Sequence, residues 1–168
     1  LPETVNGKKP ADSSIEFRNV SYSYDGVKNA VENVSLNIHS GSTVAFVGPS
    51  GSGKSTMANL ISRFFDVSEG QVLVGGVDVR NIKKDILMDN VSFVFQNSHL
   101  IKGTILDNVR MARPQASKEE VMNALEKSQC MDIVKKLPNG VDTVVGTNGV
   151  YLSGGEQQRI AIARVMLK

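Results

Sequence analysis

The sequence predicts an α/β fold on three observations. Residues 15–24 and 34–38 alternate apolar and polar side chains, as strands with one buried face do. A short apolar run then leads through a glycine-rich loop into an amphipathic stretch, and further along the chain two helix-start signals precede apolar segments. With 168 residues, of which 40 % are hydrophobic, the chain has the length of about one domain and enough apolar material for a core.

Composition narrows the class of protein. The net charge is +2, so the basic footprint typical of nucleic-acid-binding proteins is absent and we expect no nucleic-acid partner. The single cysteine, Cys130, cannot form a disulfide within the chain, which fits a reducing compartment. We find no run of 18 apolar residues and no leader-like segment, and expect a chain of cytosolic character or the soluble, cytosolic part of something larger.

The N-terminal part predicts an arm followed by two strands. Residues 1–14 are polar, contain two prolines and a glycine, and predict a linker or exposed arm. Residues 15–24 and 34–38 carry strand-type alternation, and Asp25-Gly26 is a turn signal between them.

The middle of the chain combines apolar runs with one amphipathic helix. Residues 43–47 (TVAFV) and 91–95 (VSFVF) are almost continuously apolar, which predicts strands buried on both faces. Residues 70–79 predict two short strands around a Gly-Gly pair. The helix expected after Gly53 places four apolar side chains on one inward face: Met57, Leu60, Ile61 and Phe64.

Two capping boxes predict helices in the C-terminal half. Ser117 with Glu120 predicts a helix to about Leu137, where Pro-Asn-Gly stops it. Ser153 with Glu156 predicts a second helix that runs to the end of the chain.

Residues 48–55 match the pattern G-x-x-x-x-G-K-[ST] in full, between a predicted strand and a predicted helix. Glycines let backbone N–H groups turn toward an anion at the helix N-terminus. Lys54 can reach the β- and γ-phosphates of a nucleotide, and the Ser55 hydroxyl can ligate Mg²⁺. The predicted phosphate-binding residues are Gly48, Pro49, Ser50, Gly51, Ser52, Gly53, Lys54, Ser55 and Thr56. The pattern alone does not distinguish a kinase, a GTPase, a helicase or a transporter.

The stretch YLSGGEQQRIAIAR, residues 151–164, resembles the signature motif of the ABC ATPases. The signature residues are Ser153, Gly154, Gly155, Glu156 and Gln157. The resemblance covers residues 15–168 and implies a P-loop NTPase (RecA-like) core with an N-terminal antiparallel β subdomain and an α-helical signature subdomain. On this basis we expect the β subdomain and phosphate-loop core in residues 15–96, the helical subdomain in 97–152 and the signature helix in 153–168.

The resemblance also implies roles for two residues outside the phosphate loop. Tyr24 resembles the aromatic residue that stacks on adenine, although it could be an ordinary strand residue. Gln96 resembles the Q-loop glutamine, which joins Mg²⁺ or the attacking water to the membrane domain; without the resemblance it could be a surface amide. The implied catalytic residues are Lys54 and Gln96, the metal ligands are Ser55 and Gln96, and the cofactors are ATP and Mg²⁺.

The family pairs two such domains head to tail, with ATP between the phosphate loop of one and the signature of the other. The implied partners are a second ABC ATPase domain, from the same chain type or a paralogue, and a transmembrane domain at the cytoplasmic face of the membrane. Residues 103–109 and 140–149 resemble the subgroup in which the ATPase domain is fused behind a membrane domain, which is the exporter type. Thr147 stands where such members usually carry glutamate, so importers built on the exporter plan, such as siderophore transporters, stay open.

The sequence departs from the family at its end. After Ser153 the only carboxylate side chain is that of Glu156. The strand ending in Asp-Glu and the switch histidine that follow in the family are not present, so we expect a fragment that lacks the C-terminal Walker B part. We expect the full-length parent to hydrolyse ATP and this chain alone not to do so.

Three other functions would also use a phosphate loop. A non-hydrolysing half of a heterodimeric transporter stays open. A soluble ABC ATPase of DNA repair would carry a long coiled coil between Gln96 and Ser153, where only 56 residues lie. An unrelated P-loop kinase does not account for the signature.

Overall fold

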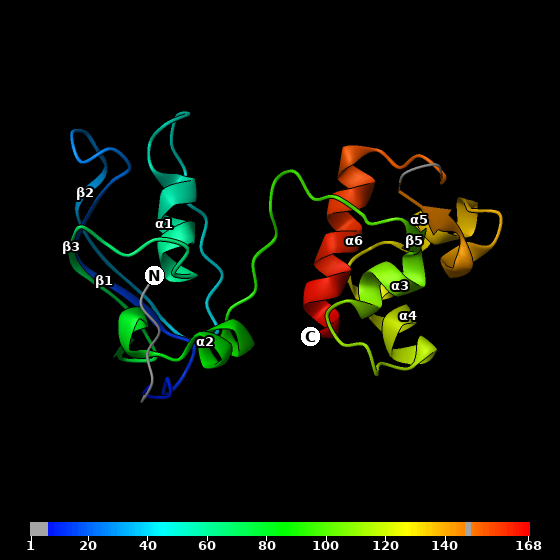
Figure 1. Ribbon diagram of the computed structural model, residues 1–168, viewed down its shortest axis with the longest axis horizontal. Helices are drawn as coiled ribbons and strands as arrows, with labels where there is room; N and C mark the ends of the chain where they lie inside the picture. The colour runs from blue at the N-terminus through cyan, green and yellow to red at the C-terminus, as the bar shows by residue number, and fades with distance from the viewer. Residues whose placement is uncertain (1–6, 147–148) are drawn as a thin grey trace. The chain divides into compact units, whose positions relative to one another are not determined.

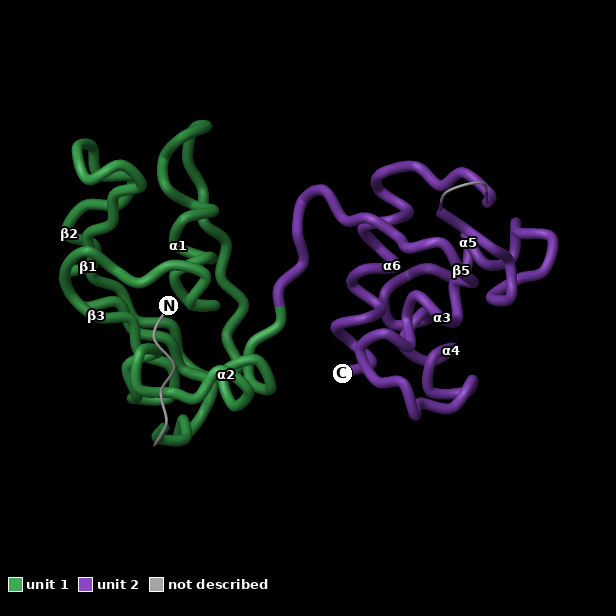
Figure 2. Tube along the Cα trace, viewed as in Figure 1, with its two compact units in different colours: residues 1–92 green, residues 93–168 purple. Residues whose placement is uncertain are grey.

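The computed structural model describes residues 7–146 and 149–168. The chain forms two compact units, the first ending at Ser92 and the second beginning at Phe93 (Figure 2). Each unit has its own hydrophobic core. The length of the chain predicts about one domain, and the structure divides that length into two separately packed units. Within the described residues, no helix is both long and apolar enough to span a bilayer.

The first unit is built on a four-stranded antiparallel sheet with the strand order β2-β1-β3-β4 (Figure 1). The strands are β1 (Ile15–Ser23), β2 (Asn29–Ile38), β3 (Glu69–Val74) and β4 (Val77–Asp78). Phe17 of β1 lies opposite Leu36 on one side and Val72 on the other. Because side chains alternate between the faces of a strand, this register buries Phe17 and Val72 in the core together. The predicted antiparallel β subdomain is confirmed.

Two helices complete the first unit: α1 (Lys54–Ile61), which packs against β2 and β3, and α2 (Lys84–Asn90). A short 3₁₀ turn, Val79–Asn81, precedes α2. Leu60 is buried, and Met57 and Ile61 pack against the same core, as the predicted inward face requires. Phe64 departs from that prediction because α1 ends at Ile61, before the left-handed residue Arg63 (φ 51°).

The described part of the N-terminal arm lies along the turn between β3 and β4. The Lys8 N–H donates to the carbonyl of Asn81 at 2.9 Å, and the Ala11 N–H donates to the carbonyl of Gly75 at 3.0 Å. The Gly75 N–H donates in return to the carbonyl of Ser14. Gly75 has a positive φ of 54°, and a Cβ placed on it would lie 2.5 Å from the Asp12 carbonyl oxygen, so glycine is required where the arm crosses this turn.

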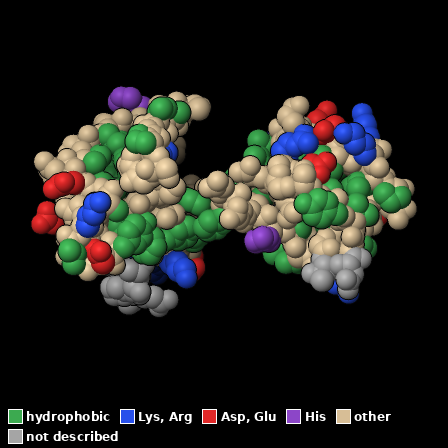
Figure 3. Space-filling model, turned by 90° about the horizontal axis from the view of Figure 1, so that it is seen from above, with side chains coloured by type: hydrophobic (Ala, Val, Ile, Leu, Met, Phe, Trp, Pro, Cys, Tyr) green, Lys and Arg blue, Asp and Glu red, His purple; other side chains and the backbone are tan. Residues whose placement is uncertain are grey.

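The strands predicted at residues 43–47 and 91–95 are wrong: both segments are irregular. Val44 and Val47 are 51 % and 93 % exposed, although their sequence is typical of a strand buried on both faces. Hydrophobic side chains reach the surface of both units on the face drawn in Figure 3. A β-strand requires a hydrogen-bond ladder with a neighbouring strand. Among the strand pairings of the described residues, none involves residues 43–47.

The second unit is mainly helical. Its helices are α3 (Ile105–Arg110), α4 (Lys118–Lys127), α5 (Met131–Lys136) and α6 (Gly154–Leu167). Two short strands, β5 (Gly103–Thr104) and β6 (Val144–Val145), pair antiparallel, and a 3₁₀ turn covers Gly140–Asp142. Both α3 and α4 pack on α6 (Figure 1), whose Ile160 and Ala163 are fully buried. The signature helix is therefore the central element of this unit.

The helix predicted from Ser117 to about Leu137 is divided into α4 and α5. Gln129 takes the left-handed conformation with φ 57°. Its N–H donates to the carbonyl of Glu126, and the N–H of Cys130 donates to the carbonyl of Leu125 at 2.8 Å. This pair of bonds is the Schellman motif that ends a helix. Sequence reasoning missed the break because glycine usually marks it, and here glutamine adopts it. The capping boxes predicted at Ser117 and Ser153 are both confirmed.

Amide hydrogen exchange of the 168-residue polypeptide tests the irregular state of residues 43–47. We expect the amides of Val44 and Val47 to exchange about a hundredfold or more faster than those of Phe17 and Val72, which lie in the sheet. Mass spectrometry of the corresponding peptides measures this ratio. Equal protection in the two regions would mean that 43–47 forms a strand after all.

Candidate functional site

The phosphate loop of residues 48–53 leads directly into α1. Gly53 is the N-cap of α1 with φ 86°, and a Cβ on it would lie 2.6 Å from the carbonyl oxygen of Ala30. Gly51 also has a positive φ, of 81°. No side chain caps α1, so the N–H groups of its first turn are left to another acceptor. This geometry suits an anion at the positive end of the helix dipole.

Lys54 lies inside the loop that precedes it. Its ammonium donates to the carbonyl oxygens of Gly48 at 2.9 Å and Pro49 at 2.7 Å, and to the hydroxyl of Ser52 at 3.3 Å. These acceptors are neutral, and a phosphate oxygen is a stronger acceptor for an ammonium group. The loop therefore holds the cation within itself, ready to exchange carbonyl oxygens for phosphate oxygens.

The residue types at the start of α1 fit Mg²⁺. Ser55 is exposed in the first turn and presents a hydroxyl oxygen. Mg²⁺ prefers oxygen ligands and usually keeps few of them from protein, with substrate phosphates and water supplying the rest. A single hydroxyl beside the predicted phosphate position meets that requirement.

Tyr24 follows β1 directly and reaches α1. Its hydroxyl lies 3.0 Å from the hydroxyl of Thr56, which is buried in α1. Its ring meets those of Tyr22 and Phe65 edge-on, with centroids 4.9 and 5.5 Å away. The residue remains 59 % exposed, so ring surface is available to a planar ligand beside the phosphate loop. The link through Thr56 and the support from Phe65 were not predicted, because they join positions distant in sequence.

The turn after Tyr24 is fixed by Asp25. Its carboxylate accepts from the backbone N–H groups of Lys28 and Val27 and from the hydroxyl of Ser23. These donors, in that order, lower the pKa of Asp25 to about 2. The carboxylate stays ionised at all ordinary pH values, so the turn that carries Tyr24 keeps its shape.

The signature residues form the start of α6. The Ser153 hydroxyl accepts from the Glu156 N–H at 3.3 Å, and the Glu156 carboxylate accepts from the Ser153 N–H and hydroxyl, both at 2.8 Å. A Cβ on Gly154 or Gly155 would meet no atom within 4 Å, so the glycines leave this turn bare. The side-chain amide of Gln157 donates to the carbonyl of Leu152 and secures the approach to the helix.

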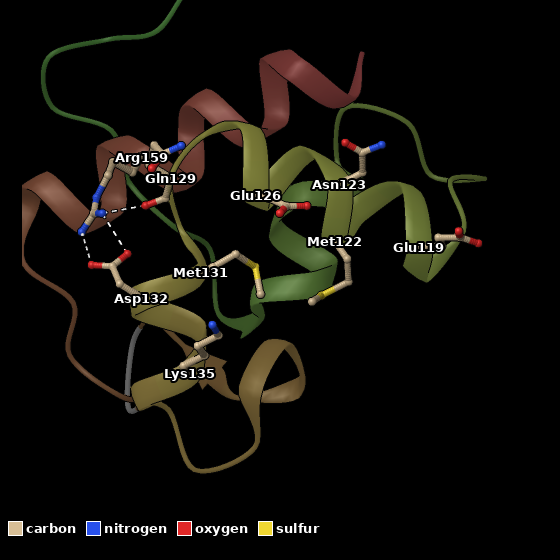
Figure 4. A pocket seen from close by; sticks show the side chains of 9 residues that line it. All are labelled: Glu119, Met122, Asn123, Glu126, Gln129, Met131, Asp132, Lys135 and Arg159. Carbon is tan, nitrogen blue, oxygen red and sulfur yellow. Dashed lines mark hydrogen bonds and ion pairs between the residues drawn. The ribbon is translucent and has the colours of Figure 1, made fainter.

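The predicted site residues fall into two sets. Tyr24 and the phosphate loop belong to the first unit, whereas Gln96 and the signature belong to the second. Gln96 is exposed, in an irregular segment where the Ser98 hydroxyl donates to the carbonyl of Phe95. Thr147 lies outside the described residues. A cavity of about 830 Å³ in the second unit is lined by α4, α5 and Arg159 (Figure 4), and none of the predicted site residues lines it.

Comparisons with known proteins identify the family and similar chains. A family profile described as "ABC transporter" matches residues 31–168. An ATP-dependent lipid A-core flippase of Haemophilus influenzae (strain 86-028NP) is 43 % identical over 99 % of the chain, and one of Escherichia coli (strain K12) is 48 % identical over 94 %. A solved structure titled as a bacterial Atm1-family ABC exporter with ATP bound superposes with a TM-score of 0.91 at 38 % identity, over 99 % of the chain. The chain spans 29 % and 28 % of the two flippases and 30 % of the exporter chain.

The capping box at the signature predicts that the start of α6 responds to pH. Hydrogen bonds from the Ser153 N–H and then its hydroxyl hold the pKa of the Glu156 carboxyl below its ordinary value of 4.5. A lowered pKa contributes stability above the unfolded-state value and loses it as pH falls through the folded-state value. We expect amide protection at the start of α6 to decrease on acidification below about pH 4.5, and this pH dependence to vanish in Glu156→Gln. An acid response that persists in Glu156→Gln would assign it to another group.

Proposed function

Because the chain belongs to the ABC transporter family, we propose that it is the ATP-binding part of a membrane transporter in which ATP binding and hydrolysis drive transport. One observation carries the proposal. The same chain contains the phosphate loop that holds Lys54 and a helix, α6, whose capping box is followed by two glycines without side chains. A nucleotide site needs a cradle for phosphates, and a closing switch needs a second surface that senses them. Hydrolysis and transport are activities of the whole protein in this proposal.

The first unit binds the nucleotide. The base stacks on the exposed ring of Tyr24, while the N–H groups at the start of α1 and the ammonium of Lys54 take the phosphates. Ser55 of this unit would supply a ligand to Mg²⁺, and the metal would neutralise charge that develops on the phosphates during hydrolysis. Gln96, which belongs to the second unit, would act on bound ATP as a further Mg²⁺ ligand. Lys54 leaves the carbonyl oxygens of Gly48 and Pro49 when the phosphates arrive, so binding also reshapes the loop.

The second unit serves the nucleotide of another copy. N–H groups at the start of α6 sit at the positive end of the helix dipole, and Gly154 and Gly155 admit a phosphate closely. We place ATP between the phosphate loop of one chain and Ser153–Gln157 of its partner, head to tail. Two such contacts related by two-fold symmetry close the pair, and hydrolysis reopens it.

The whole protein is proposed to be an exporter in which this chain is fused to a transmembrane domain and lies at the cytoplasmic face. The similarity to lipid A-core flippases and to an Atm1-family exporter supports this architecture. A lipid is the substrate class that the flippases suggest. The importer alternative rests on Thr147 alone. The alternative that the chain belongs to a non-hydrolysing half of a heterodimer is tested by measuring ATP turnover of the whole protein.

Lys54→Ala in the whole protein is expected to abolish ATP binding, because it removes the only ammonium group held within the phosphate loop of the described structure. Lys84→Ala, on the exposed face of α2, is the charge-matched control and should bind normally. Isothermal titration measures both affinities. Unchanged affinity in Lys54→Ala would make the phosphate-loop assignment wrong.

Tyr24→Ala is expected to weaken ATP by about 1–3 kcal/mol, the usual worth of stacking between a base and an aromatic ring. Inorganic triphosphate has no base and should lose little. Tyr24→Phe keeps the ring and removes only the hydroxyl that meets Thr56, so it should bind ATP nearly as the wild type does. Equal losses for ATP and triphosphate in Tyr24→Ala would point to a folding defect instead of a lost stack.

A further inference from the structure

Asn108 of α3 is fully buried and uses its entire side-chain hydrogen-bonding capacity. Its amide nitrogen donates to the carbonyl oxygens of Ile101 at 3.0 Å and Thr104 at 2.9 Å. Its amide oxygen accepts from the Ile101 N–H at 3.0 Å and from Arg164 at 2.8 Å. A single buried amide therefore joins the segment that follows Gln96 to the signature helix.

Arg164 supplies the other half of this connection from α6. Its Nε donates to the Asn108 carbonyl oxygen and its Nη2 to the Asn108 side chain, both at 2.8 Å. Its Nη1 reaches the carbonyl oxygen of His99, at 3.4 Å. His99 lies three residues after Gln96. The guanidinium thus binds both α3 and the segment of residues 96–101, which we call the Gln96 segment. The single ammonium group of a lysine could not make these bonds at the same time.

The partners of Arg164 in these bonds are all neutral oxygens. Burial lowers the pKa of the guanidinium, which is partly buried. Burying a charge is costly unless hydrogen bonds compensate it, and three such bonds converge here. Apolar side chains would pack α3 and the segment after Gln96 against α6 at a lower free-energy cost. The buried polar connection therefore indicates that the relative position of these elements matters.

We propose that Arg164 and Asn108 are positioning residues that lock the Gln96 segment to the signature helix, so that the two contacts made with nucleotide move as one body. The inference rests on the proposed function, in which Gln96 and Ser153–Gln157 both act on bound ATP. It assigns the coupling of these contacts to one buried hydrogen-bond network.

Arg159 of the same helix provides the matched control. Its guanidinium donates to the Gln129 carbonyl oxygen at 2.7 Å and to Asp132 at 2.9 Å (Figure 4). It therefore ties α6 to α5 and to the end of α4. Arg159→Lys makes the same chemical change as Arg164→Lys, in the same helix, without touching the Gln96 segment.

The test is a double-mutant cycle on ATP turnover of the whole protein, with Arg164→Lys and Gln96→Ala singly and together. We expect Arg164→Lys to lower kcat about fivefold with the KM for ATP changed less than about twofold, because the phosphate loop is untouched. Adding Arg164→Lys to Gln96→Ala should cost no further activity, since the position of an absent amide no longer matters. Arg159→Lys should keep kcat within about twofold of wild type and combine additively with Gln96→Ala.

A second variant separates positioning from folding. Asn108→Asp keeps the acceptor for Arg164 but replaces the two N–H donors to Ile101 and Thr104, and it should reproduce the kcat loss and the non-additivity. Amide exchange at buried Ile160 reports whether α6 stays folded in each variant.

The outcomes separate the inference from the proposed function. Three results would overturn the inference: additive losses when Arg164→Lys is combined with Gln96→Ala, an equal kcat loss in Arg159→Lys, or a kcat that Gln96→Ala does not change. In each case, turnover that still depends on Lys54 would leave the proposed function standing. Turnover that persists in Lys54→Ala would remove the proposed function and the inference together.

Discussion

The unpaired N–H groups at the start of α1 and of α6 are the constraint on which both halves of the proposed site depend. A helix cannot satisfy these donors within itself. At α1 the N-cap is the left-handed Gly53, with no side chain to accept from them, so they remain for a ligand. At α6 Ser153 and Glu156 satisfy part of the need, and two bare glycines leave the rest accessible. The backbone N–H groups at the helix start are therefore available to a ligand in the first unit, and only part of them are available in the second.

Each unit gives its helix start a rigid support of a different kind. In the first unit, antiparallel strands complete their own ladder, and Tyr24 extends from the end of β1 to Thr56 of α1. In the second unit, α6 is buried through Ile160 and Ala163 and donates hydrogen bonds from Arg159 and Arg164 to neighbouring segments. Local caps orient the first turn, and these longer-range bonds fix the direction in which that turn points.

The apolar segment 43–47 shows what a strand needs beyond its own sequence. Its residues have high β propensity, yet Val47 is almost fully exposed and the segment is irregular. The sheet of the first unit holds together without it because β1, β2 and β3 bond to one another. Propensity describes fitness for a pleated, buried surface, and the surface has to be supplied by neighbouring strands.

The sequence by itself determined the features that depend on neighbouring residues: the phosphate-loop pattern, the capping boxes at Ser117 and Ser153, the half-buried strands and the resemblance that led to the family. Only the tertiary structure decided the features that depend on distant ones. It divided the chain into two units, ended a helix at Gln129, left 43–47 without a ladder, and joined Asn108 to Arg164. The physical reason is that caps and turns are satisfied within a few residues, whereas ladders and buried polar networks require partners whose positions the whole fold sets.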